Sequence, residues 1–249
     1  MTSTIRLTSM LVTAAVLAAC GRDAQTDEAV TTRTADGEAS TSISGDLADK
    51  RGEALVRVVN AVSGAKGLSV RADETHALPT VDYKAVSPYQ PIDKTWVSFQ
   101  VSGESNGAYM PLETNREMLV DGHRYTMVVM READGDAYRT RIVRDNISDD
   151  MSKAHLRVIH AASGVDEVDV VARGGDKLFE GVNFSSEAGF KDLDPWKGTL
   201  EIRTEDGNKL LLTVPNVNLQ AGRSYSIVLT RGAQGKLEAV RFEDMPVAQ

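Results

Sequence analysis

Side chains with reactive chemistry are few in this chain, which has one cysteine and four histidines. No two of the histidines have the spacing of a zinc site, and no carboxylate is placed beside two of them. Residues 103–107 carry the Gly-x-Ser-x-Gly pattern of a nucleophile elbow, but that chemistry needs a strand-to-helix turn, and a polar hairpin is expected here. We therefore predict no catalytic residues, no metal, no cofactor and no enzyme activity, and keep a hydrolase only as a minor alternative.

Two ring side chains are candidates for binding a partner. His160 lies on the same face of an expected strand as Leu156 and Val158. There it either contacts a ligand or bonds to neighbouring backbone, a role that Asn60 could copy at the corresponding earlier position. Tyr89 lies between two prolines, a stiff setting that suits a contact surface, although packing at the end of a β-domain is the favoured alternative.

Three aspartates, Asp145, Asp149 and Asp150, gather in one short stretch. Carboxylate oxygens are ligands that Ca²⁺ prefers, and a bound ion would stiffen the connection between two domains. The spacing is not that of an EF-hand loop, so other loops would have to supply the remaining oxygens. A calcium site and a solvated acidic linker are therefore both open, and the linker is favoured.

The first 20 residues predict export of the chain. Arg6 precedes an apolar run from Met10 to Ala19, which is about half the length that a membrane-spanning helix needs. The run ends in residues 17–20, Leu-Ala-Ala-Cys, which resemble the lipobox of bacterial lipoproteins. The resemblance implies cleavage after residue 19 and a lipid on Cys20, with two or more acyl chains giving durable anchoring. Because Gly21 is not the aspartate of an inner-membrane retention signal, we expect the outer membrane.

Residues 20–53 are expected to form a disordered tether behind the lipid. The stretch after Cys20 lacks aromatic residues and carries 4 basic and 8 acidic residues. As a flexible coil it would span roughly 30 Å, keeping the folded part near the membrane. The whole chain has 249 residues and a net charge of -8, which repels phosphate backbones and argues against nucleic-acid binding.

The folded part contains two copies of one module. Residues 55–64 align with residues 155–164, and the same offset of 100 joins Leu119, Gly122, Tyr125 and Arg131 to their later counterparts. Alternating apolar and polar residues at 168–172, 200–203 and 225–229 predict strands, and Gly-rich turns separate them. We therefore expect an all-β chain with antiparallel sandwiches at residues 54–148 and 153–246, after the signal peptide at 1–19.

Each module also has the pattern of a tyrosine corner. Tyr125 and Tyr225 open an apolar strand and follow Leu-x-x-Gly by a fixed distance. In such a corner the ring packs at the edge of a sheet and the hydroxyl bonds to upstream backbone. A structural role is therefore favoured over ligand stacking.

The repeated segments resemble a known bacterial and archaeal family, the domain of unknown function 4397. The resemblance is carried by residues 156–164, by Val-Asp-Val at 168–170, by Pro-Trp-Lys-Gly-Thr at 195–199 and by residues 219–225, and it covers both modules. It implies an immunoglobulin-like or transthyretin-like sandwich on exported proteins, with no established activity. Gly164 stands where the family usually has proline.

Three functions are consistent with these features. The leading hypothesis is a non-enzymatic, lipid-anchored envelope protein whose paired sandwiches bind a protein, a glycan or a wall component. The second is a calcium-stiffened spacer that supports envelope machinery. The third, a hydrolase, requires a convergent acid, base and nucleophile that the sequence does not display.

Overall fold

The computed structural model describes residues 31–33, 39–41, 53–73, 76–105, 108–109, 112–114, 116–132 and 137–244. Within these residues the secondary structure is entirely β, in two successive sandwiches, which confirms the predicted fold class. None of the described residues belongs to a helix long and apolar enough to cross a membrane.

Module 1 consists of two main sheets. The first has the order β13-β12-β3-β6, and the second has the order β10-β8-β4-β5 with β9 added beside β8. A separate pair, β11-β7, extends one end of the module. The strands are β3 (Ala54–Asn60), β4 (Ala65–Ala72), β5 (His76–Ala77), β6 (Gln90–Ile92), β7 (Trp96–Val97), β8 (Phe99–Ser105), β9 (Ala108–Tyr109), β10 (Leu112–Glu113), β11 (Glu117–Met118), β12 (Arg124–Arg131) and β13 (Tyr138–Arg144).

Module 2 repeats this plan with longer strands. Its two four-stranded sheets have the orders β17-β14-β20-β21 and β16-β15-β18-β19. The strands are β14 (Ala154–His160), β15 (Glu167–Ala172), β16 (Lys177–Asn183), β17 (Ser186–Leu193), β18 (Trp196–Thr204), β19 (Leu210–Leu219), β20 (Ser224–Arg231) and β21 (Leu237–Asp244).

One strand pair in each module is parallel, which differs from the antiparallel sheets expected from the sequence. β3 runs parallel to β12, and β14 runs parallel to β20. Alternation of apolar residues fixes which side chains face inward but not the direction of the neighbouring strand. The first strand also lies in a different sheet from the second, unlike the A-B-E-D sheet of an immunoglobulin constant-type domain.

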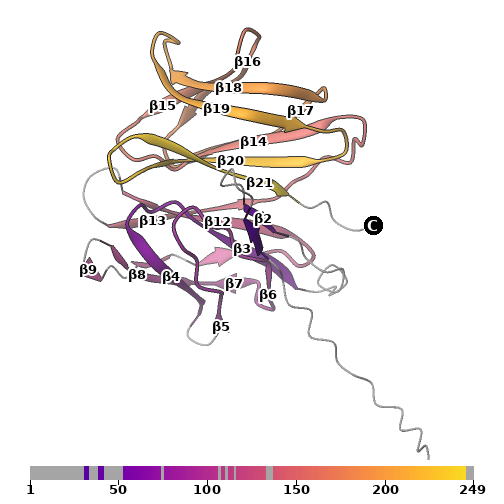
Figure 1. Cartoon of the computed structure of the whole chain (residues 1–249). Helices are drawn as coiled ribbons and strands as arrows, with labels where there is room; N and C mark the ends of the chain where they lie inside the picture. Colours follow the sequence, from indigo (N-terminus) through magenta and orange to yellow (C-terminus); the bar gives the residue numbers. More distant parts are fainter. Residues whose placement is uncertain are drawn as a thin grey trace, which may run out of the picture.

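Three apolar cores hold the molecule together. One lies inside each sandwich, and the third lies between the modules, where β14, β20 and β21 face β3, β12 and β13 (Figure 1). The sequence predicted one apolar face for each strand. β3 and β14 are nevertheless buried along their whole length, because in each case the other module covers the second face. The third core contains Val59, Val128 and Met130 from module 1 and Ile159, Val228 and Phe242 from module 2.

The tyrosine corners occur in both modules as predicted. The hydroxyl of Tyr125 accepts a hydrogen bond from the backbone N–H of Val120 at 2.9 Å. The hydroxyl of Tyr225 accepts one from the N–H of Gln220 at 3.2 Å. Gly122 lies in the connecting turn with φ +74°, a conformation that a side chain would strain.

The predicted signal peptide and Cys20 lie outside the described residues, as does most of the predicted tether. The described part of the tether is a short hairpin, formed by β1 (Thr31–Arg33) and β2 (Ala39–Thr41), where the sequence predicted no ordered structure. β2 lies next to β21 of module 2 (Figure 1).

Candidate functional site

The junction between the modules contains four buried charges. Arg57 on β3 and Arg157 on β14 occupy equivalent positions, and their side chains are 2% and 1% exposed. Arg57 of module 1 pairs with Asp244 of module 2, and Nη2 of Arg157 lies 2.6 Å from Oδ1 of Asp145 in module 1. Each arginine therefore crosses the junction to a carboxylate of the other module, and the cluster is neutral as a whole.

Hydroxyl groups complete this cluster. The Nε of Arg57 donates to Oγ1 of Thr126 at 2.9 Å, and the Nε of Arg157 donates to Oγ of Ser226 at 2.6 Å. Burial opposes ionisation of Asp145, but Arg157 and Arg57 outweigh it and hold the pKa of this carboxyl below its ordinary value. Each of the four charged groups of the cluster therefore has a partner in its own module and one in the other module.

Tyr89, a predicted binding residue, belongs to this junction. The residue is 1% exposed, and its hydroxyl donates to Oδ2 of Asp145 at 2.5 Å. The guanidinium of Arg57 lies 4.6 Å from the centre of its ring. Burial raises the pKa of Tyr89 well above its ordinary value. Tyr89 is thus packed inside the protein, as the favoured alternative predicted, and does not form an exposed contact surface.

His160, the other predicted binding residue, is also buried in the structure. Its Nδ1 accepts a hydrogen bond from the N–H of Ala162 at 3.3 Å, and its ring meets Phe184 edge-on at 6.0 Å. Asn60 has the same role in module 1, because its Oδ1 accepts the N–H of Val62 at 2.9 Å. Burial lowers the pKa of His160 from 6.5 to about 4, so the imidazole is neutral near pH 7. The structure therefore shows the alternative in which His160 bonds to neighbouring backbone.

The three aspartates of the predicted calcium site are not brought together. Asp145 is buried and faces Arg157, whereas Asp149 and Asp150 are exposed in the connection that follows. The Asp150 carboxylate accepts hydrogen bonds from the N–H and the hydroxyl of Ser152. In the described part of the chain, no group of three or more His, Cys, Asp or Glu side chains could hold a metal. The structure therefore does not bring together the three carboxylates of the calcium alternative, because Asp145 is paired with the arginines of the junction.

No single motif in the sequence indicated Arg57 or Arg157. Their signal was present, because the same cation recurs at the same position of both repeats, inside a strand that is otherwise apolar. Arginine is almost never fully buried unless it is paired. The partners Asp145 and Asp244 follow at the ends of β13 and β21, too far along the chain to be assigned by spacing.

A cavity of about 330 Å³ opens at another part of the junction. Arg131 and Arg231, at the ends of β12 and β20, donate hydrogen bonds to the carbonyl oxygens of Ser63 and Ser163. The hydroxyl of Thr230 donates across the junction to the carbonyl oxygen of Ala61 at 2.6 Å. The described lining is formed by Ala61, Ser63, Arg131, Ala161, Ser163, Arg231, Gly232, Ala233 and Gly235.

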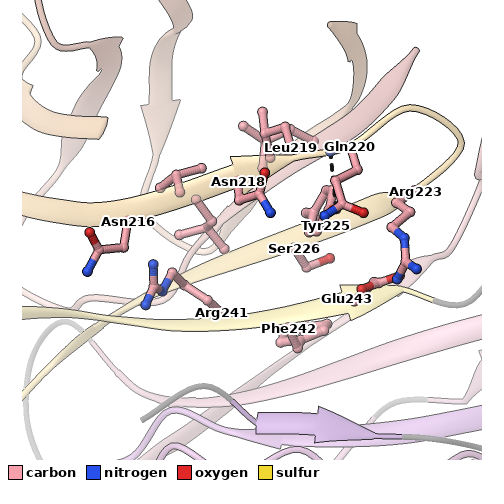
Figure 2. Close-up of a pocket in the computed structure, with 13 residues that line it drawn as sticks. Asn216, Asn218, Leu219, Gln220, Arg223, Tyr225, Ser226, Arg241, Phe242 and Glu243 are labelled. Carbon is pink, nitrogen blue, oxygen red and sulfur yellow. Dashed lines mark hydrogen bonds and ion pairs between the residues drawn. The ribbon is translucent and has the colours of Figure 1, made fainter. Parts of the chain in front are cut away.

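A second cavity, of about 250 Å³, lies at the edge of module 2 between β19, β20 and β21 (Figure 2). We call it the edge pocket. Its apolar wall is formed by Leu156, Val217, Leu219, Ile227 and Phe242. Its polar lining consists of the three amides Asn216, Asn218 and Gln220, together with Arg223, Tyr225, Ser226, Arg241 and Glu243.

The chain path of β19 shapes one end of the edge pocket. The pairing of β18 with β19 shifts between Gly198 and Leu200, and Asn216 has φ +56°, so β19 carries a bulge here. Nη1 of Arg241 donates to the carbonyl oxygen of Pro215 at 2.8 Å and so holds the bulge against β21. Figure 2 shows Asn216 and Arg241 at this end of the pocket.

An ion pair borders the opposite end of the edge pocket. Nη1 of Arg223 lies 2.7 Å from Oε1 of Glu243, and both side chains are partly exposed (Figure 2). Ser226 is the one serine of the lining, and its hydroxyl is taken up by Asp244, to which it donates at 2.6 Å. The described lining therefore offers hydrogen-bonding groups but no free serine nucleophile.

The chain was compared with known proteins. The pattern of the family described as "Domain of unknown function (DUF4397)" matches residues 54–171 and again residues 154–249. No curated protein matches the chain. Among solved structures, the C-terminal domain of AlgF from P. aeruginosa is 23% identical, with 37% of this chain and 99% of that chain covered and a TM-score of 0.32.

Two further solved structures are more distant. A candidate cell adhesion protein from Bacteroides ovatus is 12% identical, with 80% and 99% of the two chains covered and a TM-score of 0.25. A carbohydrate-binding module of family CBM26 from Eubacterium rectale Amy13K, in complex with maltoheptaose, is 7% identical, with 78% and 98% covered and a TM-score of 0.23. All three TM-scores lie below 0.5, so these structures say nothing about the function of this chain.

Proposed function

The chain belongs to the DUF4397 family, with two copies in tandem, and we propose that it is a non-enzymatic, lipid-anchored envelope protein that binds a glycan through its second module. The edge pocket carries this proposal. Its exposed amides, Asn216, Asn218 and Gln220, each donate and accept hydrogen bonds, as sugar hydroxyls also do. The apolar residues of the lining are almost fully buried, so the contacts with a sugar would come mainly from these amides.

The same lining supports a binding role over catalysis. A hydrolase needs a nucleophile within hydrogen-bond reach of a base. In the edge pocket the Ser226 hydroxyl is committed to Asp244 and Arg157, and the Tyr225 hydroxyl is committed to the tyrosine corner. Arg223 and Glu243 are paired with one another. The pocket thus has groups that orient a ligand and no arrangement that would attack one.

The two modules would contribute differently to binding. Asn218 and Gln220 correspond to Met118 and Val120 in module 1, at the offset of 100 residues. Module 1 therefore does not repeat these amides. We propose that module 2 holds the ligand and that module 1 supports it through the charged junction.

The lipid anchor rests on the lipobox at residues 17–20. Cys20 is the chain's only cysteine, and a lipid on its thiol would tether both modules to a bacterial membrane, with the outer membrane expected. Mass spectrometry of the protein purified from membranes tests this part. We expect a diacylglyceryl group on Cys20 and an N-terminus at that residue, and release of a Cys20→Ala variant from the membrane fraction. An unmodified cysteine would refute the anchor.

Glycan binding is tested by calorimetric titration of the purified full chain. The probes are soluble peptidoglycan fragments and lipopolysaccharide oligosaccharides. Asn218→Ala and Gln220→Ala should each weaken binding about tenfold, because each loses one or two hydrogen bonds. Asn183→Ala removes an exposed amide of β16 outside the edge pocket and should bind like the wild type. Equal affinities for all four proteins, or no binding of either probe, would reject the proposal.

A further inference from the structure

Module 1 exposes three large apolar side chains at one end. Trp96 is 53% exposed, Met118 is 54% exposed and Val120 is 39% exposed. Trp96 and Met118 are direct partners in the β7–β11 pair, so their side chains lie on the same face. We call these three residues the apolar patch. Their neighbours Val97 and Leu119 point into the core of module 1.

Module 2 provides a comparison for this patch within the same chain. Lys197 and Asn218 are partners in the β18–β19 pair at the place where Trp96 and Met118 are partners in module 1. Gln220 corresponds to Val120 and, like Val120, precedes a tyrosine corner. All three module 2 residues are exposed and polar. The fold therefore does not require apolar side chains here, and a contact outside the module explains them better.

The patch lies where the chain enters module 1 from the tether. The N–H of Gly122, two residues beyond Val120, donates to the carbonyl oxygen of Glu53 at 3.0 Å. The N–H of Leu55 donates to the carbonyl oxygen of His123 at 2.9 Å. Glu53 is the last residue of the predicted tether, which begins at Cys20. The patch thus lies beside the point where the predicted tether joins module 1.

We propose that Trp96, Met118 and Val120 form a membrane-contacting surface that holds module 1 against the bilayer in which Cys20 is anchored. This inference rests on the lipid anchor of the proposed function. Tryptophan favours the interface between water and lipid, because its ring is apolar while its N–H finds a polar partner. Methionine and valine would enter the acyl boundary beside it.

The tether makes such a small surface sufficient. Three half-exposed side chains give weak affinity for a membrane when the protein is free in solution. Linking a protein to a surface raises its local concentration there, to the order of 1 mM for a short linker. A contact of millimolar affinity is then occupied for much of the time. The lipid and the patch together would fix how the protein sits on the membrane, whereas the lipid alone would leave it free to turn.

The test couples the full chain to vesicles through Cys20, which is the only cysteine. Maleimide lipid in phosphatidylcholine vesicles supplies the anchor, and brominated acyl chains quench tryptophan that reaches them. The Trp96→Lys variant keeps only Trp196, the second of two tryptophans, so its quenching measures the background from Trp196. We expect strong quenching of the wild type above this background. Met118→Asn with Val120→Gln keeps Trp96 but installs the residues of module 2, and should reduce the quenching several-fold.

Leu210→Gln is the matched control, because Leu210 is 45% exposed on β19 in the other module. Its tryptophan fluorescence should be quenched as strongly as that of the wild type, and thermal unfolding should show that all variants are folded. Wild-type quenching no higher than that of Trp96→Lys would overturn the proposal and leave a protein as the partner of the patch. Because the coupling is chemical, this result is independent of whether cells attach lipid to Cys20, which mass spectrometry decides separately.

Discussion

Substituting Asp145 by asparagine tests the charged junction most directly. The side chain keeps its size and some hydrogen bonds, but the cluster would then hold two arginines against Asp244 alone. Asp145 is fully buried, and Arg157 lies 2.6 Å from it, so water cannot compensate the excess charge. Removing one partner of a buried ion pair costs about 3 to 5 kcal/mol, and we expect a loss of about 3 kcal/mol because Asp244 remains 3.1 Å from Arg157.

The measurement is the free energy of unfolding of the full chain by urea, followed by two optical probes to check for a two-state transition. For a chain of this size, a loss of about 3 kcal/mol corresponds to a melting temperature roughly 6 to 12 °C lower. Asp73→Asn is the control, since Asp73 pairs with Lys94 at 2.6 Å on the surface. Exposed pairs contribute less than about 1 kcal/mol.

A double-mutant cycle decides whether charge is the cause. Arg157→Met alone leaves two carboxylates against one arginine, and Arg157→Met with Asp145→Asn restores a neutral cluster of Arg57 and Asp244. The double variant should therefore be more stable than the sum of the single losses predicts, by at least about 1.5 kcal/mol. Additive losses, or a loss for Asp145→Asn no larger than that for Asp73→Asn, would refute the electrostatic explanation of the junction.

Two more predictions concern single hydrogen-bonding groups. His160 has a pKa of about 4 when folded and 6.5 when exposed, so the unfolded chain binds the proton first as the pH falls. Its contribution of about 3 kcal/mol to the free energy of unfolding is fully present above pH 6.5 and is lost between pH 6.5 and 4. Urea unfolding at several pH values should show this fall in the free energy of unfolding. His160→Asn, which installs the residue of module 1, should reduce the pH dependence. An unchanged slope in the variant would assign the acid sensitivity to other groups. Tyr125→Phe removes the hydroxyl that accepts the N–H of Val120 and should lower the free energy of unfolding by about 1 kcal/mol, measured by urea unfolding. An unchanged free energy of unfolding would contradict a stabilising role for the corner.

The repeat, the β-class and the tyrosine corners could be predicted from the amino-acid sequence alone. These features depend on local signals: an offset of 100 residues between equivalent motifs, alternation along short segments, and a tyrosine a fixed distance after a glycine turn. It also indicated that His160 and Asn60 share a role, which the hydrogen bonds to Ala162 and Val62 show.

The sequence did not predict what covers the second face of β3 and β14, because that depends on how the two modules pack. Alternation tells which side chains face inward in one sandwich, but it says nothing about a second sandwich that buries the opposite side chains. Arg57 pairs with Asp244, 187 residues later in the sequence. Asp145 pairs with Arg157 and does not lie with Asp149 and Asp150, as the calcium hypothesis required. The cost of burying a charge is offset only by a partner placed in three dimensions, so no local pattern could have assigned these pairs.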